Sequence, residues 1–128
     1  MKRILLLLAA VFLLSRAPAV LALGDVYFYG EELEKGAVAQ ALLAGVDVPY
    51  ARLPFHPYEG GGFVASHLKA ALFMVLGPSV LAHKVAAILW GLLVVGATAV
   101  WLGRHGGPGA ALLGGLLVAL GPAHFQAQ

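Results

Sequence analysis

Three apolar stretches, each of about 20 residues, dominate the pattern of hydrophobic and polar positions along this chain. That is the length an α-helix needs to cross the hydrocarbon core of a bilayer. Ser15, Arg16 and Pro18 interrupt the first stretch (4–23), whereas the second (85–103) and the third (106–123) carry no charge. The pattern predicts an all-α integral membrane protein with about three transmembrane helices. We expect these helices over 1–23, 79–103 and 106–124.

The first stretch has a second interpretation, as a secretory signal. Two basic residues precede an apolar run, and Ala17-Pro18-Ala19 then resembles a small-residue cleavage site. Against cleavage, apolar residues resume as far as Leu23, and an arginine near a helix end can extend its charge to the membrane interface. We therefore expect an uncleaved span, with a cleaved signal as the alternative.

A polar segment, 24–62, follows the first stretch and is expected to form an outer loop. Within it, Gly30 and Gly45 bracket apolar residues at helical spacing, which predicts an amphipathic helix over 31–44. The proline-rich connector after this helix disfavours regular structure. The loop is thus expected to contain a single helix.

A shorter apolar segment, 63–77, lies between the loop and the second span. It is too short to cross a bilayer comfortably, so we predict an interfacial or re-entrant helix. Gly77 and Pro78 are expected to end this helix, and Ser79 to cap the next one.

Charged residues are unevenly distributed and suggest an orientation. Lys2, Arg3 and the turn at Arg104 are basic, so the positive-inside rule places the N-terminus and that turn in the cytoplasm. The polar loop then faces the periplasm or the exterior of, by expectation, a bacterial inner (cytoplasmic) membrane. It contains all six acidic residues: Asp25, Glu31, Glu32, Glu34, Asp47 and Glu59.

Composition excludes several other classes of protein. The net charge is only +2 and no basic cluster is interleaved with aromatic residues, so we expect no nucleic-acid partner. The chain has no cysteine, which excludes disulfides and thiolate metal sites. His56 and Glu59 are three residues apart, but Pro57 lies between them and no helix is expected there. The sequence leaves the presence of a metal undecided.

Small residues recur at every fourth position of the third span. Such a ladder lets another helix approach closely, and that helix can come from this chain or from another. We take the ladder to favour a piece of a larger bundle over an isolated three-span protein. Its members are Gly107, Ala111, Gly115 and Ala119.

Three basic side chains border the apolar helices after the loop. They are interpreted as interfacial anchors, with attraction of a lipid phosphate as the alternative. These residues are His67, His83 and Lys84.

The order of these features resembles a known family. A first span ends near Arg16 and a loop opens with adjacent carboxylates, and the chain then continues with Leu42-Leu43-Ala44-Gly45, a Pro-Tyr segment, Glu59-Gly60-Gly61 and Gly77-Pro78-Ser79-Val80-Leu81-Ala82. This arrangement is similar to the N-terminal part of membrane glycosyltransferases of the GT-C superfamily. It looks most like the dolichyl-phosphate-mannose-protein mannosyltransferases and the bacterial aminoarabinose and lipopolysaccharide-core sugar transferases. The resemblance covers nearly all 128 residues through loose patterns.

The resemblance implies transfer of a sugar, with inversion, from a polyprenyl-phosphate donor to an acceptor hydroxyl. It implies that the catalytic carboxylate is Glu32 or the adjacent Glu31, with Asp25 as a third candidate. Family members often have Asp-Glu where this chain has Glu-Glu, which leaves open which residue acts. The carboxylate would serve as a general base or help to bind a divalent metal. From their position alone, and not from the resemblance, we hypothesise that the cations Lys69, His83 and Lys84 offset the charge of the donor phosphate.

The resemblance also implies partners. Such enzymes carry many more spans, so we expect this polypeptide to be an N-terminal fragment that is inactive alone. Its expected partners are a lipid-linked sugar donor, membrane lipids, and the missing C-terminal part or other membrane helices. The alternative is a small accessory or structural membrane protein without catalysis, whose Gly/Ala face docks a larger partner.

Overall fold

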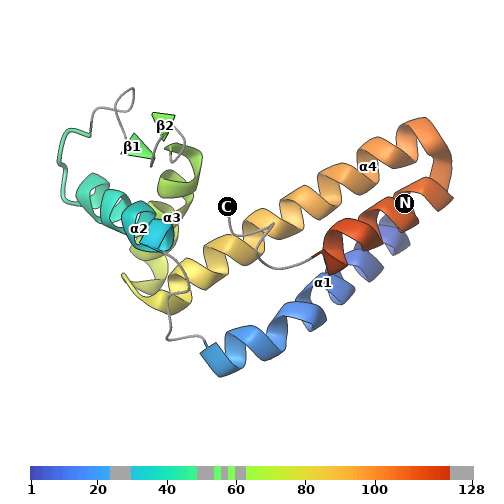
Figure 1. Cartoon of the computed structure of the whole chain (residues 1–128), viewed down its shortest axis with the longest axis horizontal. Helices are drawn as coiled ribbons and strands as arrows, with labels where there is room; N and C mark the ends of the chain where they lie inside the picture. Colours follow the sequence, from blue (N-terminus) through green and yellow to red (C-terminus); the bar gives the residue numbers. More distant parts are fainter. Residues whose placement is uncertain (24–29, 49–53, 56–57, 60–62, 122–128) are drawn as a thin grey trace. The chain divides into compact units, whose positions relative to one another are not determined.

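The computed structural model describes residues 1–23, 30–48, 54–55, 58–59 and 63–121 (Figure 1). Over these residues the chain is almost entirely helical. The elements are α1 (Lys2–Leu23), α2 (Gly30–Leu43), β1 (Pro54–Phe55), β2 (Tyr58–Glu59), α3 (Phe63–Leu76) and α4 (Val80–Leu120). The chain divides into two compact units: a bundle unit, Met1–Leu23 with Ala87–Gln128, and a loop unit, Gly24–Ala86.

Two of the described helices, α1 and α4, are long and apolar enough to cross a membrane. Only 12% of the most apolar window of α1 and 22% of that of α4 is buried inside the protein, whereas the core helix of a soluble protein is mostly buried. Large apolar side chains therefore cover the outside of both helices, among them Leu6, Leu93 and Leu117. This exposure indicates a membrane protein, since water disfavours apolar surface on such a scale.

Helix α4 is bent back on itself at Gly107. That residue has φ 80° and ψ −178°, a backbone conformation that only glycine adopts at low cost. Pro108 follows and suits the first position of a new helix, where its missing N–H group costs nothing. The 41 residues of α4 thus form a first arm (80–106) and a second arm (108–120) that returns beside α1 (Figure 1). The turn at the end of the first arm carries Arg104, where the sequence predicts a boundary between two spans.

The core of the bundle unit consists of α1 packed between the two arms. Leu8 and Phe12, one turn apart on α1, are buried together with Val95, Ala99 and Ala119. Glycine makes this packing possible, because a Cβ at Gly91 would collide with the Phe12 ring and one at Gly115 would collide with Leu8. Close backbone approach of this kind is how small residues hold membrane helices together.

The small-residue ladder of the second arm is therefore filled from within the chain. Ala111 and Ala119 are fully buried, and Gly115 receives the side chain of Leu8. Gly107 does not take part, since it forms the bend. The ladder gives no reason to expect a further helix on this face, and our sequence-based preference for a larger bundle loses that support.

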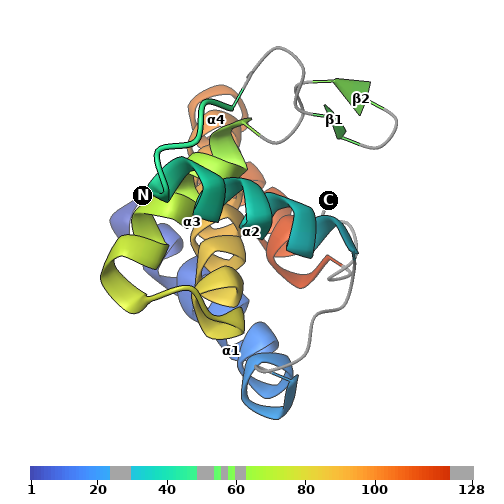
Figure 2. The ribbon, with the colours of Figure 1, turned by 90° about the vertical axis from the view of Figure 1, so that its left-hand side faces the viewer.

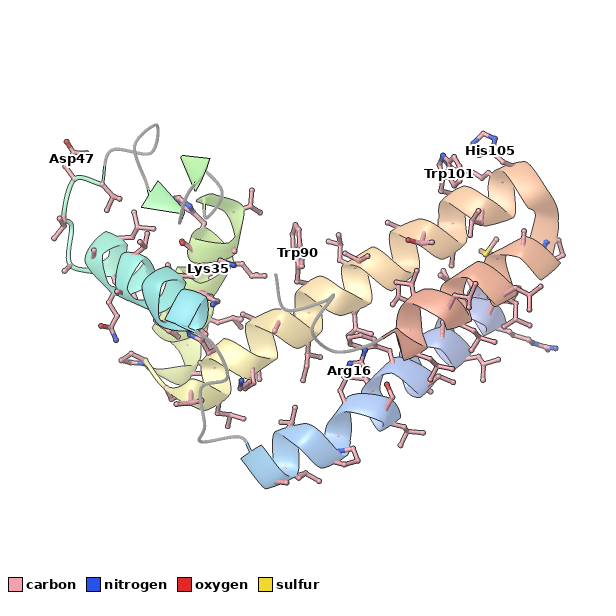
Figure 3. All side chains as sticks on the ribbon, in the orientation of Figure 1. Arg16, Lys35, Asp47, Trp90, Trp101 and His105 are labelled. Atoms are coloured by element: carbon pink, nitrogen blue, oxygen red, sulfur yellow. The ribbon has the colours of Figure 1, made fainter. Side chains whose placement is uncertain are left out.

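Helix α1 runs unbroken through its polar interruption. The Ser15 hydroxyl donates to the carbonyl of Phe12 at 2.8 Å, and Pro18 lies within the helix. The Arg16 guanidinium donates to the carbonyl of Gly121 at 2.7 Å and lies over the Phe12 ring (Figure 3). A cation here satisfies a carbonyl left unpaired at the end of α4 and complements the helix dipole. Arg16, which the sequence predicts to extend its charge to the membrane interface, thus caps the end of another helix.

In the loop unit α2 lies across α3 (Figure 2). Their contact is apolar: Ala39 of α2, Ala70 and Phe73 of α3, and Ala82 at the start of α4 are buried together. Most of the side chains at this crossing are small, so the helix backbones approach closely. The first turns of α4 belong to this unit, which ends at Ala86.

The helix ends of the loop unit follow local sequence signals. Gly45 has φ 71°, and the N–H groups of Gly45 and Val46 donate to the carbonyls of Leu42 and Ala41 in a Schellman motif. Gly77, with φ 77°, ends α3. The N–H of Ala82 donates to the Ser79 hydroxyl at 3.2 Å, which confirms the predicted cap of α4.

A short hairpin departs from the sequence-based expectation for the proline-rich connector. Pro54 pairs with Glu59 and Phe55 with Tyr58 in an antiparallel register. Proline is tolerated at the first position of a strand, which is where Pro54 stands. The connector thus contains regular structure where none was predicted.

Candidate functional site

Four polar side chains are buried in the loop unit, an unusual feature for so small a unit. Ser66 and Lys69 come from α3, and His83 and Lys84 from the first turns of α4. Their exposed fractions are 1% for Ser66, 7% for Lys69, 1% for His83 and 7% for Lys84. We call these four residues the basic cluster. Burial of charge is costly unless partners compensate it, so their position demands an explanation.

Two members of the basic cluster form a hydrogen bond with each other. Lys69 Nζ lies 2.5 Å from His83 Nε2. A lysine ammonium and a doubly protonated imidazole both only donate, so one of the two must supply a lone pair. The pair therefore holds one proton fewer than two separate cations would. The Phe73 ring, with its centroid 5.8 Å from that of His83, covers the imidazole on the apolar side.

The backbone of α2 lies directly on this imidazole. A Cβ placed on Gly36 would come within 2.6 Å of His83 Cε1, which is closer than real contacts allow. Gly36 and Ala39 are both buried and lie three residues apart on α2. They define the face of α2 that is turned towards the basic cluster.

The backbones of Glu31 and Glu32 lie in the first turn of α2. Four residues separate Glu32 from Gly36, which is a rotation of roughly 40° about the helix axis. Five residues separate Glu31 from Gly36, a rotation of roughly 140°. Glu32 thus occupies a position on the inward face and Glu31 a position away from it. Asp25, the third candidate, lies outside the described residues.

The predicted cations are brought together, but not at a surface. Lys69, His83 and Lys84 share the interior of the loop unit, so the expectation of interfacial anchors does not describe His83 and Lys84. His67, on the opposite side of α3, is exposed.

Metal-binding geometry is not found in the described part of the chain. No three histidine, aspartate or glutamate side chains gather there as a metal site would require. His56 lies outside the described residues, whereas Glu59 belongs to β2. The described residues therefore add no candidate metal ligands to those considered from the sequence.

Two contributors to the site escaped the sequence-based reasoning. Ser66 lies one turn before Lys69 and Ala70, so its place on the buried face of α3 follows from helical spacing with Phe73. Gly36 is a glycine inside a helix, a signal that often marks a close approach of another group. Both signals are present in the sequence, but the sequence does not show which groups pack against Ser66 and Gly36.

Comparison with family models, with curated proteins and with solved structures finds no match to this chain.

Proposed function

We propose that this chain forms the first outer loop and the flanking spans of an inverting membrane glycosyltransferase of the GT-C type. The observation that carries the proposal is that α2, whose first turn contains Glu31 and Glu32, lies at Gly36 against His83 of a buried basic cluster. A carboxylate is the group that this reaction needs to accept the proton of the acceptor hydroxyl.

In the proposed reaction a carboxylate of this turn takes the proton of an acceptor hydroxyl. The hydroxyl oxygen then attacks the anomeric carbon of a polyprenyl-phosphate sugar from the face opposite the phosphate. The bond from the anomeric carbon to the phosphate oxygen breaks, and the polyprenyl phosphate leaves with that electron pair. Inversion follows from the single displacement. A divalent metal held by the same carboxylate would instead act on the phosphate charge.

The proposal places the loop unit on the outer side of a bacterial cytoplasmic membrane. Two long apolar helices support this placement: α1, and the first arm of α4, which exceeds the length of a bilayer core at 1.5 Å per residue. Arg104 and His105 at the bend then face the cytoplasm. Trp101 lies against His105, with ring centroids 5.2 Å apart, in the manner of an aromatic anchor at a membrane interface (Figure 3).

The proposal also retains α1 in the mature protein. Leu8 and Phe12 of α1 fill the glycine sites of both arms, and Arg16 caps α4. Cleavage after Ala19 would remove this core. The same packing weakens the alternative of an accessory protein, because the small-residue face on which that protein would dock its partner is occupied by α1.

Replacing the candidate carboxylates tests the proposal. The gene's whole reading frame is expressed in cells lacking it, and transfer of labelled sugar from a polyprenyl-phosphate donor is measured in isolated membranes. Glu32→Gln should abolish transfer, because an amide cannot accept the acceptor's proton, while the protein level in the membrane stays unchanged. Asp47→Asn, at an exposed position outside the α2 turn, is the matched control and should retain activity. Normal transfer by both Glu31→Gln and Glu32→Gln would refute the assignment.

A further inference from the structure

The buried cations of the loop unit require a negative charge close to them. Lys69 and Lys84 are each only 7% exposed, and the Lys69–His83 hydrogen bond lowers the number of protons without removing the positive charge. A buried charge without a counter-charge would cost several kcal/mol, enough to unfold a unit of this size. The partner should therefore be built into the packing around the cluster.

The helix phase of α2 selects the acidic position that faces the cluster. Glu32 lies roughly 40° around the axis from Gly36, and Gly36 is in direct apposition to the His83 ring. Glu34 lies roughly 160° to the other side of the same reference, and Glu31 lies roughly 140° away from it. Among the acidic positions of α2, Glu32 alone shares the inward face.

The other described charged groups next to α2 and on α3 are poorer candidates for the counter-charge. Asp47 follows α2 and is exposed to solvent. Lys35 of α2 and His67 of α3 are themselves basic. Ser66, 1% exposed, has no hydrogen-bond partner for its hydroxyl among the described residues and can donate a hydrogen bond into the cluster.

A lipid phosphate is a poorer counter-charge for Lys69 and His83. These side chains are enclosed where Gly36 of α2 lies on the imidazole and Phe73 of α3 covers it. A phosphodiester, which is bulky and carries two chains, would have to part α2 from α3 to reach them. The carboxylate of a residue already on the inward face of α2 needs no such opening.

We propose that Glu32 is the counter-ion of the Lys69–His83 pair, and that this pair is a positioning device that holds the Glu32 carboxylate rather than a binding site for donor phosphate. The inference deepens the proposed function, on which its catalytic part rests, by choosing Glu32 over Glu31. The ion pairing itself does not depend on that function. Lys69 and His83 act through Glu32 and are positioning residues.

A double-mutant cycle tests the ion pairing without any reference to sugar transfer. Thermal unfolding of the full chain is followed in detergent for wild type, Glu32→Gln, Lys69→Met and the double variant. Each single change should lower the midpoint by several degrees because it leaves one charge buried and unpaired, and the double variant should be no less stable than the worse single variant. Glu31→Gln is the matched control and should combine additively with Lys69→Met. Additive effects for Glu32 with Lys69, or coupling for Glu31 instead, would overturn the proposal.

The outcome remains decisive if Lys69→Met does not fold. The single variants Glu32→Gln and Glu31→Gln then suffice, since only the first should lower the midpoint. Equal midpoints for the two would contradict the pairing.

The positioning role has its own measurement in the membrane transfer assay. Lys69→Met should lower kcat at least tenfold with little change in the KM for the lipid donor, and Lys69→Arg should restore part of kcat. A large rise in the donor KM with kcat unchanged would show instead that Lys69 binds the donor phosphate. If transfer is absent from the wild type, the proposed function fails while the stability cycle still decides the pairing.

Discussion

Gly36 shows how a single residue sets the distance between two helices. Helix interiors disfavour glycine relative to alanine by about 1 kcal/mol, so a glycine there needs a compensating gain. The gain at Gly36 is the space occupied by the His83 ring, which lies where a Cβ would be. In this space the buried imidazole lies within hydrogen-bonding distance of Lys69. An alanine at position 36 would place its methyl group where the imidazole now lies.

The variant Gly36→Ala measures this effect. The added methyl group must displace the His83 ring, so we expect a loss of about 1–3 kcal/mol in the free energy of unfolding in spite of the better helix propensity of alanine. Gly96→Ala is the matched control, because a Cβ at Gly96 meets nothing within 4 Å and should leave stability unchanged or raise it. Thermal unfolding of both variants in detergent provides the comparison. Equal midpoints for the two variants would argue against the apposition of α2 and His83.

At the scale of elements, local signals predicted more than long-range ones. The glycine after α2 and the serine before α4 fix helix ends through hydrogen bonds within a few residues, and a sequence contains such information directly. The unbroken course of α1 and the role of Arg16 depend on the carbonyl of Gly121, more than 100 residues away. Likewise, the small-residue ladder of the second arm predicted a close contact with another helix but not which helix. The tertiary packing of the chain decides that partner.

Filling that groove tests the packing of the bundle unit. Gly115→Ile places a branched side chain against Leu8, and overpacking of this kind typically costs about 1–3 kcal/mol. Leu113→Ile, on the outward side of the same arm, is the control and should behave like wild type. Thermal unfolding of the purified chain distinguishes two cases. Reduced stability of the isolated chain supports packing against α1, whereas wild-type stability of Gly115→Ile would point to a docking face for another protein.

At the scale of the whole molecule, the acidic residues and the longest apolar helix segments fall in different units. The stretch that holds every acidic residue lies within the loop unit together with α3, whereas α1 and most of α4 build the bundle unit. The sequence identified the three cations of the basic cluster but not their burial. Spacing along a helix cannot distinguish a face covered by another helix from one covered by lipid. That distinction required knowing that α2 lies across α3 (Figure 2) and that Gly36 of α2 lies against His83.

The proposed function assumes that the loop unit lies outside the cytoplasm. The orientation follows from Lys2, Arg3 and Arg104, because basic residues near spans are retained on the cytoplasmic side. A lipid-linked donor and an external acceptor can meet only on the outer side. The orientation in the membrane is therefore the claim on which the proposed function depends.

The most direct test of that claim is the reaction of single cysteines with a membrane-impermeant maleimide in sealed spheroplasts. The chain has no cysteine of its own, so each variant carries one reactive site. Asp47 and His105 are both exposed, the first in the loop unit and the second at the bend of α4. We predict that the Asp47→Cys variant is labelled in intact spheroplasts, and that the His105→Cys variant is labelled only after the membrane is permeabilised. Labelling of His105→Cys in intact spheroplasts, with protection of Asp47→Cys, would contradict the orientation and the proposed function that depends on it.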